Sequence, residues 1–327
     1  MSILDASVNV GLETTYGSAV TPTRSMEAQS DNWTRAQSRL ESVGFRNNMQ
    51  ALRSDRVKTV NMGGAGNITS DFMTNGAGLL LGGAFGSKVA PVQQEATAAY
   101  LQTFATTDAA PADSFTVQVI RPKMESGVQQ FTHHGAKITG WNLSQGVDGL
   151  LVWSVDFDSE DVDITTAAAT PAFPSGAVPF DWSQCTATLD PDGSPSTLDL
   201  LDLSFSAELG LKTDRRYLRG SALKKEPVRS GIPSYSGEMS IDFSSTDQYA
   251  QWTAGTDLDL ELKWTGAVIA GAHSEYFSLR FKAINWTDGN PVVSLSDTPV
   301  QSLPFQVMHN GSDAAITATY MSTDTAA

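Results

Sequence analysis

The sequence predicts a mainly β protein made of two fused β units, each a β-sandwich or partly closed barrel with one short flanking helix. Three observations support this class. Apolar and polar residues alternate in several short runs, which is typical of strands with one buried face. A seven-residue pattern occurs twice, as GNITSDF at Gly66–Phe72 and as GEMSIDF at Gly237–Phe243. Between the two copies lies an uncharged segment that is rich in Ala, Thr and Pro.

The alternating runs predict the individual strands. They cover residues 115–119, 151–157, 201–211 and 258–264. In the run 201–211 every odd-numbered residue is apolar. Asp202, Ser204, Ser206 and Glu208 fall on the opposite face. We expect the first face to be buried and the second to contact water.

Each copy of the repeated pattern precedes a predicted short helix, within Met73–Phe85 and within Ser245–Gly255. The glycines of the first helix are expected to allow close packing on a sheet. A later echo, KITGW at Lys137–Trp141 and KAINW at Lys282–Trp286, suggests a further pair of equivalent strands. The glycine-rich GGAG before the first copy, Gly63–Gly66, is predicted to be a turn, because it lacks the Lys and Ser/Thr of a phosphate-binding loop.

We place the first unit at residues 1–165, a linker at 166–177 and the second unit at 178–327. Three prolines between residues 165 and 179 deny this region a regular element, so an extended crossing is expected. Two copies of one β-rich unit favour a symmetric assembly over an enzyme.

The composition narrows the function further. The formal net charge is −15 and the isoelectric point is near 4.5, which argues against a surface that grips nucleic acid. No apolar run reaches the roughly 20 residues that span a bilayer, and the N-terminus lacks the features of a secretory signal. The single cysteine, Cys185, excludes an internal disulfide. We therefore expect a protein made and folded in a cytoplasm, without membrane insertion.

No set of residues points to catalysis or to a cofactor. His133 and His134 are adjacent, so on a strand they face opposite sides and do not readily chelate one metal ion. An acidic run lies at Asp156–Asp163, but it has no glycine for the sharp turn of a calcium loop. A solvated negative face is favoured over calcium there. No nucleophile motif stands out, and the sequence predicts a protein that is not an enzyme.

Basic residues gather before each copy of the repeated pattern. The windows 24–58 and 212–229 hold 14 of the 21 Lys and Arg residues. Both windows lack strong alternation, so they are predicted to be long loops. In an acidic protein such loops suggest docking on an acidic surface of another copy, and the alternative is a solvated loop near an acidic edge of the same subunit. The candidate contact residues are Arg46, Arg53, Arg56, Lys58, Arg215, Arg216, Arg219, Lys224 and Lys225.

The N-terminal stretch Val10–Arg46 resembles the opening of phage major tail proteins, the tail tube subunits of long-tailed bacterial viruses. The resemblance covers roughly the first 75 residues and carries no catalytic signature. The residues that carry it are Gly11, Glu13, Tyr16, Gly17, Thr21, Pro22, Glu27, Arg39, Glu41, Ser42, Gly44 and Arg46.

This resemblance implies a virion protein of a non-contractile tail, assembled in the host cytoplasm. It implies β-sandwich or partly closed barrel units that form rings, and rings that stack into a tube around a tape measure protein. The tube, with tail terminator and distal tail proteins at its ends, would conduct genomic DNA without sequence-specific binding. Two fused units suggest trimeric, pseudo-sixfold rings, with hexameric rings as the alternative.

A second class of function also fits the sequence. A two-domain β-sandwich adhesin or carbohydrate-binding module would use aromatic platforms, and the chain has seven tryptophans. Trp153 and Trp264 fall on apolar strand faces, so most tryptophans are expected in the core. A hydrolase is a distant third, with no candidate residue.

Overall fold

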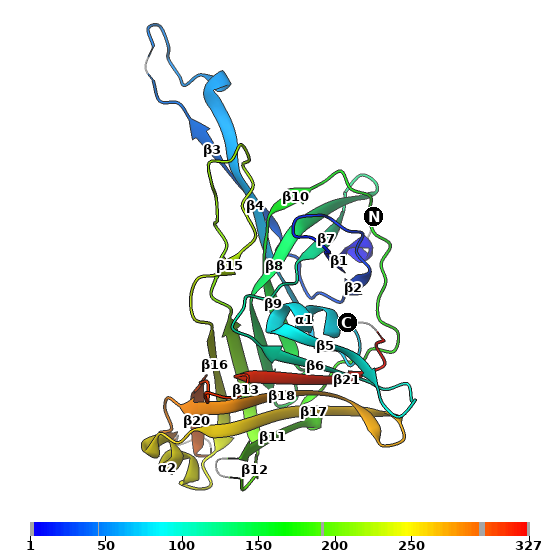
Figure 1. Cartoon of the computed structure of the whole chain (residues 1–327), viewed down its shortest axis with the longest axis vertical. Coiled ribbons are helices and arrows are strands. Elements are labelled where there is room, and N and C mark those ends of the chain that lie inside the picture. The colour runs from blue at the N-terminus through cyan, green and yellow to red at the C-terminus, as the bar shows by residue number, and fades with distance from the viewer. Residues whose placement is uncertain (1–2, 45, 191–192, 294–297, 326–327) are drawn as a thin grey trace.

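Alternating side chains produce a protein of antiparallel strands with two short helices, seen in a computed structural model that describes residues 3–44, 46–190, 193–293 and 298–325 (Figure 1). The helices are α1 Gly78–Phe85 and α2 Asp247–Ala254, both within the segments predicted from sequence. Single 3₁₀ turns lie at Ile3–Asp5, Ser54–Arg56 and Trp182–Gln184.

The strands divide between the two halves of the chain. Those of the first half are β1 Ser7–Leu12, β2 Arg24–Met26, β3 Thr34–Glu41, β4 Val57–Asp71, β5 Gly86–Gln93, β6 Tyr100–Thr106, β7 Phe115–Pro122, β8 Val128–Gly146, β9 Val152–Ser159 and β10 Asp161–Asp163. Those of the second half are β11 Cys185–Asp190, β12 Ser196–Leu198, β13 Leu200–Glu208, β14 Leu211–Lys212, β15 Val228–Arg229, β16 Ser234–Asp242, β17 Leu258–Ala270, β18 His273–Trp286, β19 Pro291–Val292, β20 Val300–Val307 and β21 Ile316–Ser322.

The same order of strand pairings occurs in both halves. In the first half the pairs are β1–β2, β1–β7, β7–β8, β8–β10, β8–β9, β9–β4 and β4–β3. In the second half they are β11–β12, β11–β17, β17–β18, β18–β21, β18–β20, β20–β16 and β16–β13. The hairpin β5–β6 has no counterpart in this correspondence.

The registers of the two halves also correspond. Gly66 pairs with Phe157, and Gly237 pairs with Phe305. A bulge interrupts β7–β8 between Phe115 and Val117, and a bulge interrupts β17–β18 between Leu258 and Leu260. By this register Trp286 corresponds to Ile138, so KITGW and KAINW lie on equivalent strands but three residues out of step.

Two pairings between the halves make one continuous sheet. β8 pairs with β13, and β6 pairs with β21. The resulting layer 1 has the order β3-β4-β9-β8-β13-β16-β20-β19, and layer 2 has the order β12-β11-β17-β18-β21-β6-β5. Layer 2 runs across layer 1 (Figure 1), and one apolar core joins residues of both halves. The architecture is mainly β and β-sandwich-like, as predicted, and of the two forms that the sequence left open for each unit, the sheets do not close into a barrel.

Glycines of the repeated pattern allow aromatic rings to cross the strands. A Cβ atom on Gly66 would lie 2.4 Å from the Trp33 ring, and a Cβ atom on Gly237 would lie 2.4 Å from the Phe305 ring. The predicted turn at Gly63–Gly66 is wrong, because these residues lie inside β4. The glycines are needed there for close approach, since a Cβ on Gly64 would lie 2.6 Å from Ser159 Oγ.

The two helices differ in burial. Every residue of α1 is buried, and a Cβ on Gly83 would lie 2.5 Å from the Phe115 ring, so the expected close packing on a sheet is confirmed. No residue of α2 is fully buried. The hairpin β5–β6 contacts α1 and has no counterpart beside α2, which accounts for the difference.

The predicted apolar faces are buried, with Leu201 as the exception. Leu203, Phe205, Ala207 and Leu209 are buried and Leu211 is partly buried, but Leu201 is exposed. In β7 the opposite face is buried as well, since Thr116 and Gln118 do not contact water. The register of β13 against β16 shifts between Leu200 and Asp202, and this bulge turns Leu201 outward. Residues 166–177 contain no helix or strand, and they run along the first half, where Ser25 N–H donates to the carbonyl of Ala172 at 2.9 Å.

Candidate functional site

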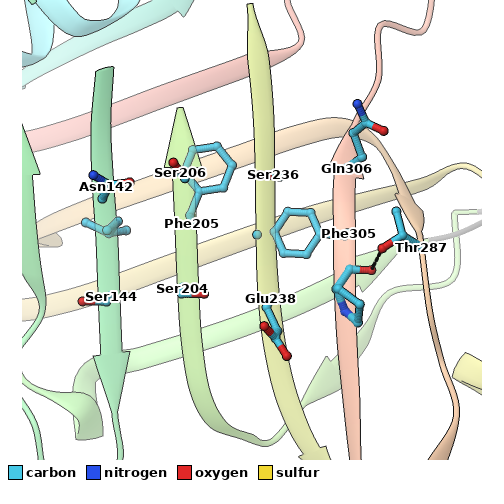
Figure 2. A pocket seen from close by; sticks show the side chains of 13 residues that line it. Asn142, Ser144, Ser204, Phe205, Ser206, Ser236, Glu238, Thr287, Phe305 and Gln306 are labelled. Carbon is cyan, nitrogen blue, oxygen red and sulfur yellow. Dashed lines mark hydrogen bonds between the residues drawn. The ribbon is translucent and has the colours of Figure 1, made fainter. Parts of the chain in front are cut away.

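The broad face of layer 1 that points away from layer 2 is covered by small polar side chains (Figure 2). Its residues come from strands of both halves because neighbouring strands are in register: Ser206 pairs with Asn142 on one side and with Ser236 on the other. The next row pairs Ser204 with Ser144 and Glu238. A shallow hollow of about 570 Å³ lies over these rows. We call this surface the polar face, formed by Asn67, Thr69, Asn142, Ser144, Ser154, Asp156, Asp202, Ser204, Ser206, Ser236, Glu238, Ser240, Ser302 and Gln306.

The polar face is chemically weak as a catalytic or binding site. None of its residues is Lys, Arg, His or Cys, so it offers hydroxyl, amide and carboxylate groups only. Within the described ranges of the chain, no group of three or more His, Cys, Asp or Glu side chains is arranged to hold a metal ion. Burial raises the pKa of Asp156, which accepts a hydrogen bond from Asn67. The polar face is thus a broad, shallow surface that carries a weak negative charge.

Layer 1 ends in two edges that bind no strand within the part of the chain that the structure describes. One edge is β3, which pairs only with β4 and whose residues are all exposed. The other is β19, which pairs only with β20; there Val292 is 66% exposed, and the next residue, Val293, is 73% exposed. Free strand edges bind other strands readily, so these two edges are candidates for assembly.

A long arm extends from the β3 edge. We define the first arm as residues 37–62; it projects from the body at one end of the longest axis (Figure 1). Four of the candidate contact residues, Arg46, Arg53, Arg56 and Lys58, lie on it. Arg53 forms a close ion pair with Asp55. The prediction of a long loop is wrong for the base of the arm, which is the hairpin of β3 and β4, and correct for the described residues of the tip, 42–44 and 46–53.

The second arm, residues 209–233, occupies the corresponding place between β13 and β16 but lies against the first half. Lys224 is buried, and its Nζ is 2.5 Å from Asp158 Oδ1. Arg216 donates to the carbonyl of Met62 at 3.0 Å, and Glu226 Oε1 lies 2.6 Å from Lys137 Nζ. These contacts lie within one chain, but they hold the loop against the first half, so it is not the solvated loop that the sequence left open as the alternative.

The remaining candidate residues of the second arm stabilise the arm itself. Arg215 donates to the carbonyl of Glu226 at 2.6 Å, and Arg219 donates to the carbonyl of Leu223 at 3.0 Å. Lys225 Nζ lies 5.5 Å from the centre of the Tyr217 ring. The structure therefore brings Arg215, Arg216, Arg219, Lys224 and Lys225 together in one arm, and leaves Arg46, Arg53, Arg56 and Lys58 on another.

The acidic run at Asp156–Asp163 is largely paired and is not the solvated face that the sequence favoured. Asp158 binds Lys224, and Asp161 Oδ1 lies 3.2 Å from Arg35 of the first arm's base. Burial raises the pKa of Asp158, although Lys224 acts in the opposite direction. Glu160 faces His134 at 3.9 Å. No local sequence signal could link Asp158 to Lys224, because the contact depends on how the two halves join.

Glu13 explains part of the N-terminal pattern. Its buried carboxylate accepts hydrogen bonds from Gly17 N–H, Ser114 Oγ, Thr116 Oγ1 and Gly135 N–H at 2.8–3.0 Å. Gly17 has a φ of 76°, which favours glycine. Glu13 thus fixes the segment after β1 to β7 and β8, and its role is structural.

Aromatic side chains give little support to a sugar platform. Trp33, Trp141, Trp153, Trp264 and Trp286 are buried, so the expectation that most tryptophans lie in the core is confirmed. Trp252 is partly buried and Trp182 is 46% exposed.

His133 is buried beside Trp33, with ring centres 4.7 Å apart, and its Nδ1 lies 3.3 Å from Ser159 Oγ. In the described part of the chain no helix is long and apolar enough to cross a membrane.

Comparison with known protein families identifies the chain. A family model described as phage tail tube protein matches residues 4–307, which is nearly the whole sequence. A search of curated proteins gives no match. The match extends the N-terminal resemblance over both halves and fits a β-rich structural subunit with free sheet edges. The chain therefore belongs to the phage tail tube protein family.

Proposed function

We propose that three copies of the chain close into a pseudo-sixfold ring, and that stacked rings form the channel of the tail. Membership of the family makes the chain a structural component of a virion tail that assembles into a tube. The proposal concerns how the ring closes and what lines it. It rests on one observation: β8 of the first half pairs with β13 of the second half, so the chain itself contains a strand pairing that joins one unit to the next.

The same junction can form between chains. β3 corresponds to β13, since Thr34 pairs with Ala65 as Ser206 pairs with Ser236. β19 corresponds to the end of β8, since Val292 pairs with Val300 as Ser144 pairs with Val152. If the β3 edge of one chain pairs with the β19 edge of its neighbour in the register of β13 with β8, Asn32, two residues before β3, lies opposite Val292.

Repetition of this contact buries both edges of layer 1 in every chain. Backbone hydrogen bonds between strands supply affinity without special side chains. A contact between unlike surfaces closes into a ring when the rotation per unit divides a full turn. With two corresponding units per chain, three chains would supply the six units that the sequence suggested. The units 1–165 and 178–327, joined by 166–177, are the repeating parts in this proposal.

The polar face would line the channel because layer 2 covers the opposite face of layer 1. Phosphates of duplex DNA are spaced at about one charge per 1.7 Å of axis, and a wall without Lys or Arg releases no counterions from them. Its carboxylates, Asp156, Asp202 and Glu238 among them, repel phosphates only over a screening length of about 8 Å at physiological salt. DNA can therefore pass without being held.

The remaining parts of the proposal follow from the tail tube role. The ring would assemble in the host cytoplasm around a tape measure protein, with tail terminator and distal tail proteins at the ends of a non-contractile tube. The chain would act without catalysis and without a cofactor. The alternative of a carbohydrate-binding module would have to use exposed aromatic side chains, which in the described residues are Phe173, Trp182, Tyr217 and Tyr249 and come from four different segments of the chain.

Cysteine cross-linking across the expected edge tests ring closure. Asn32→Cys and Val292→Cys are combined in a Cys185→Ser background, so that only engineered thiols react. Asn32 is well positioned, because its neighbours Asp31 and Trp33 are both held by Arg121. Opposite residues of paired strands come close enough for a disulfide. Oxidation should give covalent dimers and trimers on a non-reducing gel, and no larger species.

The matched control is Ser144→Cys/Ser204→Cys, the corresponding pair within one chain. It should form an intrachain disulfide and leave the mass of a monomer on a denaturing gel. Bands that continue to a hexamer would contradict the three-chain ring. If the control pair oxidises and the Asn32/Val292 pair does not, the proposed edge is wrong.

A further inference from the structure

A mostly apolar groove of about 620 Å³ opens on the first half, between the start of β1, the segment that follows β2 and the end of β7. We call it the first-half groove. The segment between the halves contributes Phe173, which is 49% exposed. At one side Arg121 donates hydrogen bonds to Asp31 and to the carbonyl of Trp33. The apolar lining residues are Val8, Met26, Ala28, Val119, Pro122 and Phe173.

The second half has the corresponding groove, but little of it is open. Cys185 and Leu203 line a notch of only about 40 Å³ there. The registers of β11 with β17 and of β13 with β16 make their counterparts Ala6 and Asp31, which line the first-half groove. The two grooves thus hold the same place in the two halves and differ in how far they are filled.

The end of β8 fills the groove of the second half. Gln145 pairs with Leu203 where the halves join, and its buried side chain accepts a hydrogen bond from Trp264 Nε1 at 2.6 Å. Further along, Val147 N–H donates to the carbonyl of Leu201 at 3.2 Å. In the described residues β3 pairs only with β4, so the first-half groove has no such strand beside it.

The counterpart of Gln145 at the other edge of layer 1 is Val293. It follows Val292, which corresponds to Ser144 in the registers of the two halves. Successive residues of a strand point to opposite faces, so Val292 holds a polar-face position and Val293 the position from which Gln145 enters the groove. In a single chain, however, Val293 is 73% exposed.

We propose that the first-half groove binds Val293 of a second copy in the same ring. This inference rests on the ring closure proposed above. When the β19 edge of one chain lies beside the β3 edge of the next in the register of β8 with β13, Val293 comes opposite Asp31, which lines the groove. Val293 and the apolar lining of the groove then leave water together, which favours the contact.

The two grooves differ in chemistry as their occupants do. Trp264, which donates to Gln145, has Arg121 as its counterpart in the registers of β17 and β7. Arg121 directs hydrogen bonds to Asp31 and Trp33 of its own half. A polar occupant therefore meets a hydrogen-bond donor in the second half, and an apolar occupant meets apolar side chains in the first.

The occupant has to come from another chain. Layer 1 has β3 at one end and β19 at the other. In the order β3-β4-β9-β8-β13-β16-β20-β19, with about 4.8 Å between neighbouring strands, the two edges are roughly 34 Å apart along the sheet. Val293 therefore cannot reach the groove of its own chain.

Substitution of two adjacent residues on opposite faces tests the contact. Val293→Asp places a charge in the groove, whereas Val292→Asp places the same charge on the polar face. Both residues are mostly exposed in a single chain, so neither variant should change circular dichroism. Native mass spectrometry over a dilution series should show that Val293→Asp needs about tenfold more protein than Val292→Asp for half-maximal trimer formation.

A substitution in the groove tests the other side of the contact. Phe173→Ser removes a half-exposed ring from the lining and should also raise the concentration for half-maximal trimer formation. The control, Val268→Ser, removes an exposed apolar side chain from the hairpin of β17 and β18, outside the groove, and should leave trimer formation unchanged.

The disulfide test of ring closure separates the two proposals. If Asn32→Cys/Val292→Cys chains cross-link into trimers while Val293→Asp and Val292→Asp assemble alike, the edges pair and the groove contact is wrong. Phe173→Ser trimers as stable as those of Val268→Ser would also overturn it. If the unmodified chain forms neither trimers nor the cross-link, ring closure itself fails, and the groove contact fails with it.

Discussion

The first and second arms occupy corresponding places and are both basic, yet they adopt different conformations. The first arm, 37–62, is a hairpin that projects from the body, and the second arm, 209–233, lies along β4 and β9 of the first half. The difference follows from their neighbours. The second arm starts at β13, beside β8 of the same chain, whereas β3 has no adjoining unit within the chain.

This comparison indicates that the surroundings, more than arm composition, determine the conformation. The second arm finds the partly buried Asp158 and the carbonyl of Met62 in its own chain. In the assembly we propose, the first arm would find its partners on other chains. The following predictions test how far the two halves correspond, beginning with the largest expected effect.

A charge in the core of the second half should prevent folding. Phe205 is buried against Phe281 and Phe305, and Phe205→Asp would place an unpaired carboxylate there. The expected cost is several kcal/mol, comparable to the whole stability of an ordinary domain. The control, Ser206→Asp, changes the next residue on the polar face and should leave circular dichroism and solubility unchanged. A folded Phe205→Asp variant would show that the second half is not needed for the shared core.

Removal of the buried Lys224 from the second arm should lower the free energy of unfolding much more than removal of a basic residue from the first arm. Lys224→Ala leaves the partly buried Asp158 without its partner, and we expect a loss of about 3 kcal/mol in the free energy of unfolding. Arg56→Ala on the exposed first arm should change it by less than about 0.5 kcal/mol. Urea denaturation of the two variants measures both values. Equal effects would mean that the second arm is not docked in solution.

Acid should destabilise the first half through His133. Burial lowers the pKa of His133 to about 3, below its ordinary value near 6.5, so the unfolded chain binds a proton more readily than the folded chain. The stability is therefore complete above pH 6.5 and is lost as the pH falls toward 3. We expect a loss of about 2 kcal/mol between pH 6.5 and pH 5 from this group.

The second half provides the matched variant for this test. The register of β8 with β7 and of β18 with β17 makes Phe281 the counterpart of His133. His133→Phe should weaken the fall in stability between pH 6.5 and pH 5, measured by denaturation at each pH. An unchanged slope would assign the acid sensitivity to other groups.

Local alternation predicted the strands well, because a period of two depends only on neighbouring residues. Leu258, Leu260, Leu262 and Trp264 are buried as expected. The alternation could not place the bulge that exposes Leu201, since a bulge depends on the partner strand. Likewise, Gly63–Gly66 suggested a turn. Their actual role is to leave room for Ser159 and Trp33, which approach β4 from distant segments of the sequence.

For the candidate contact residues, the sequence predicted less: it identified the residues but not their partners. Composition identified both groups of basic residues, but it could not show that Lys224 meets Asp158, 66 positions earlier in the sequence. The two edges of layer 1 also had no sequence signal, because an edge is defined by the absence of a pairing strand. The repeated GNITSDF and GEMSIDF patterns remain the best signal, since they lie on β4 and β16, which hold corresponding places in the two halves.

Limited proteolysis examines the arms without changing stability. In the isolated chain, trypsin should cut the exposed tip of the first arm after Arg46 and Arg53 at least tenfold faster than the second arm, where Arg216 and Lys224 are held by the first half. In assembled tubes the first arm should become resistant as well, because its partners would then be present. Mass spectrometry of the fragments identifies the cut sites. Equal cleavage of both arms in the isolated chain would contradict the docked second arm, and rapid cleavage of the first arm in tubes would contradict its contact with other chains.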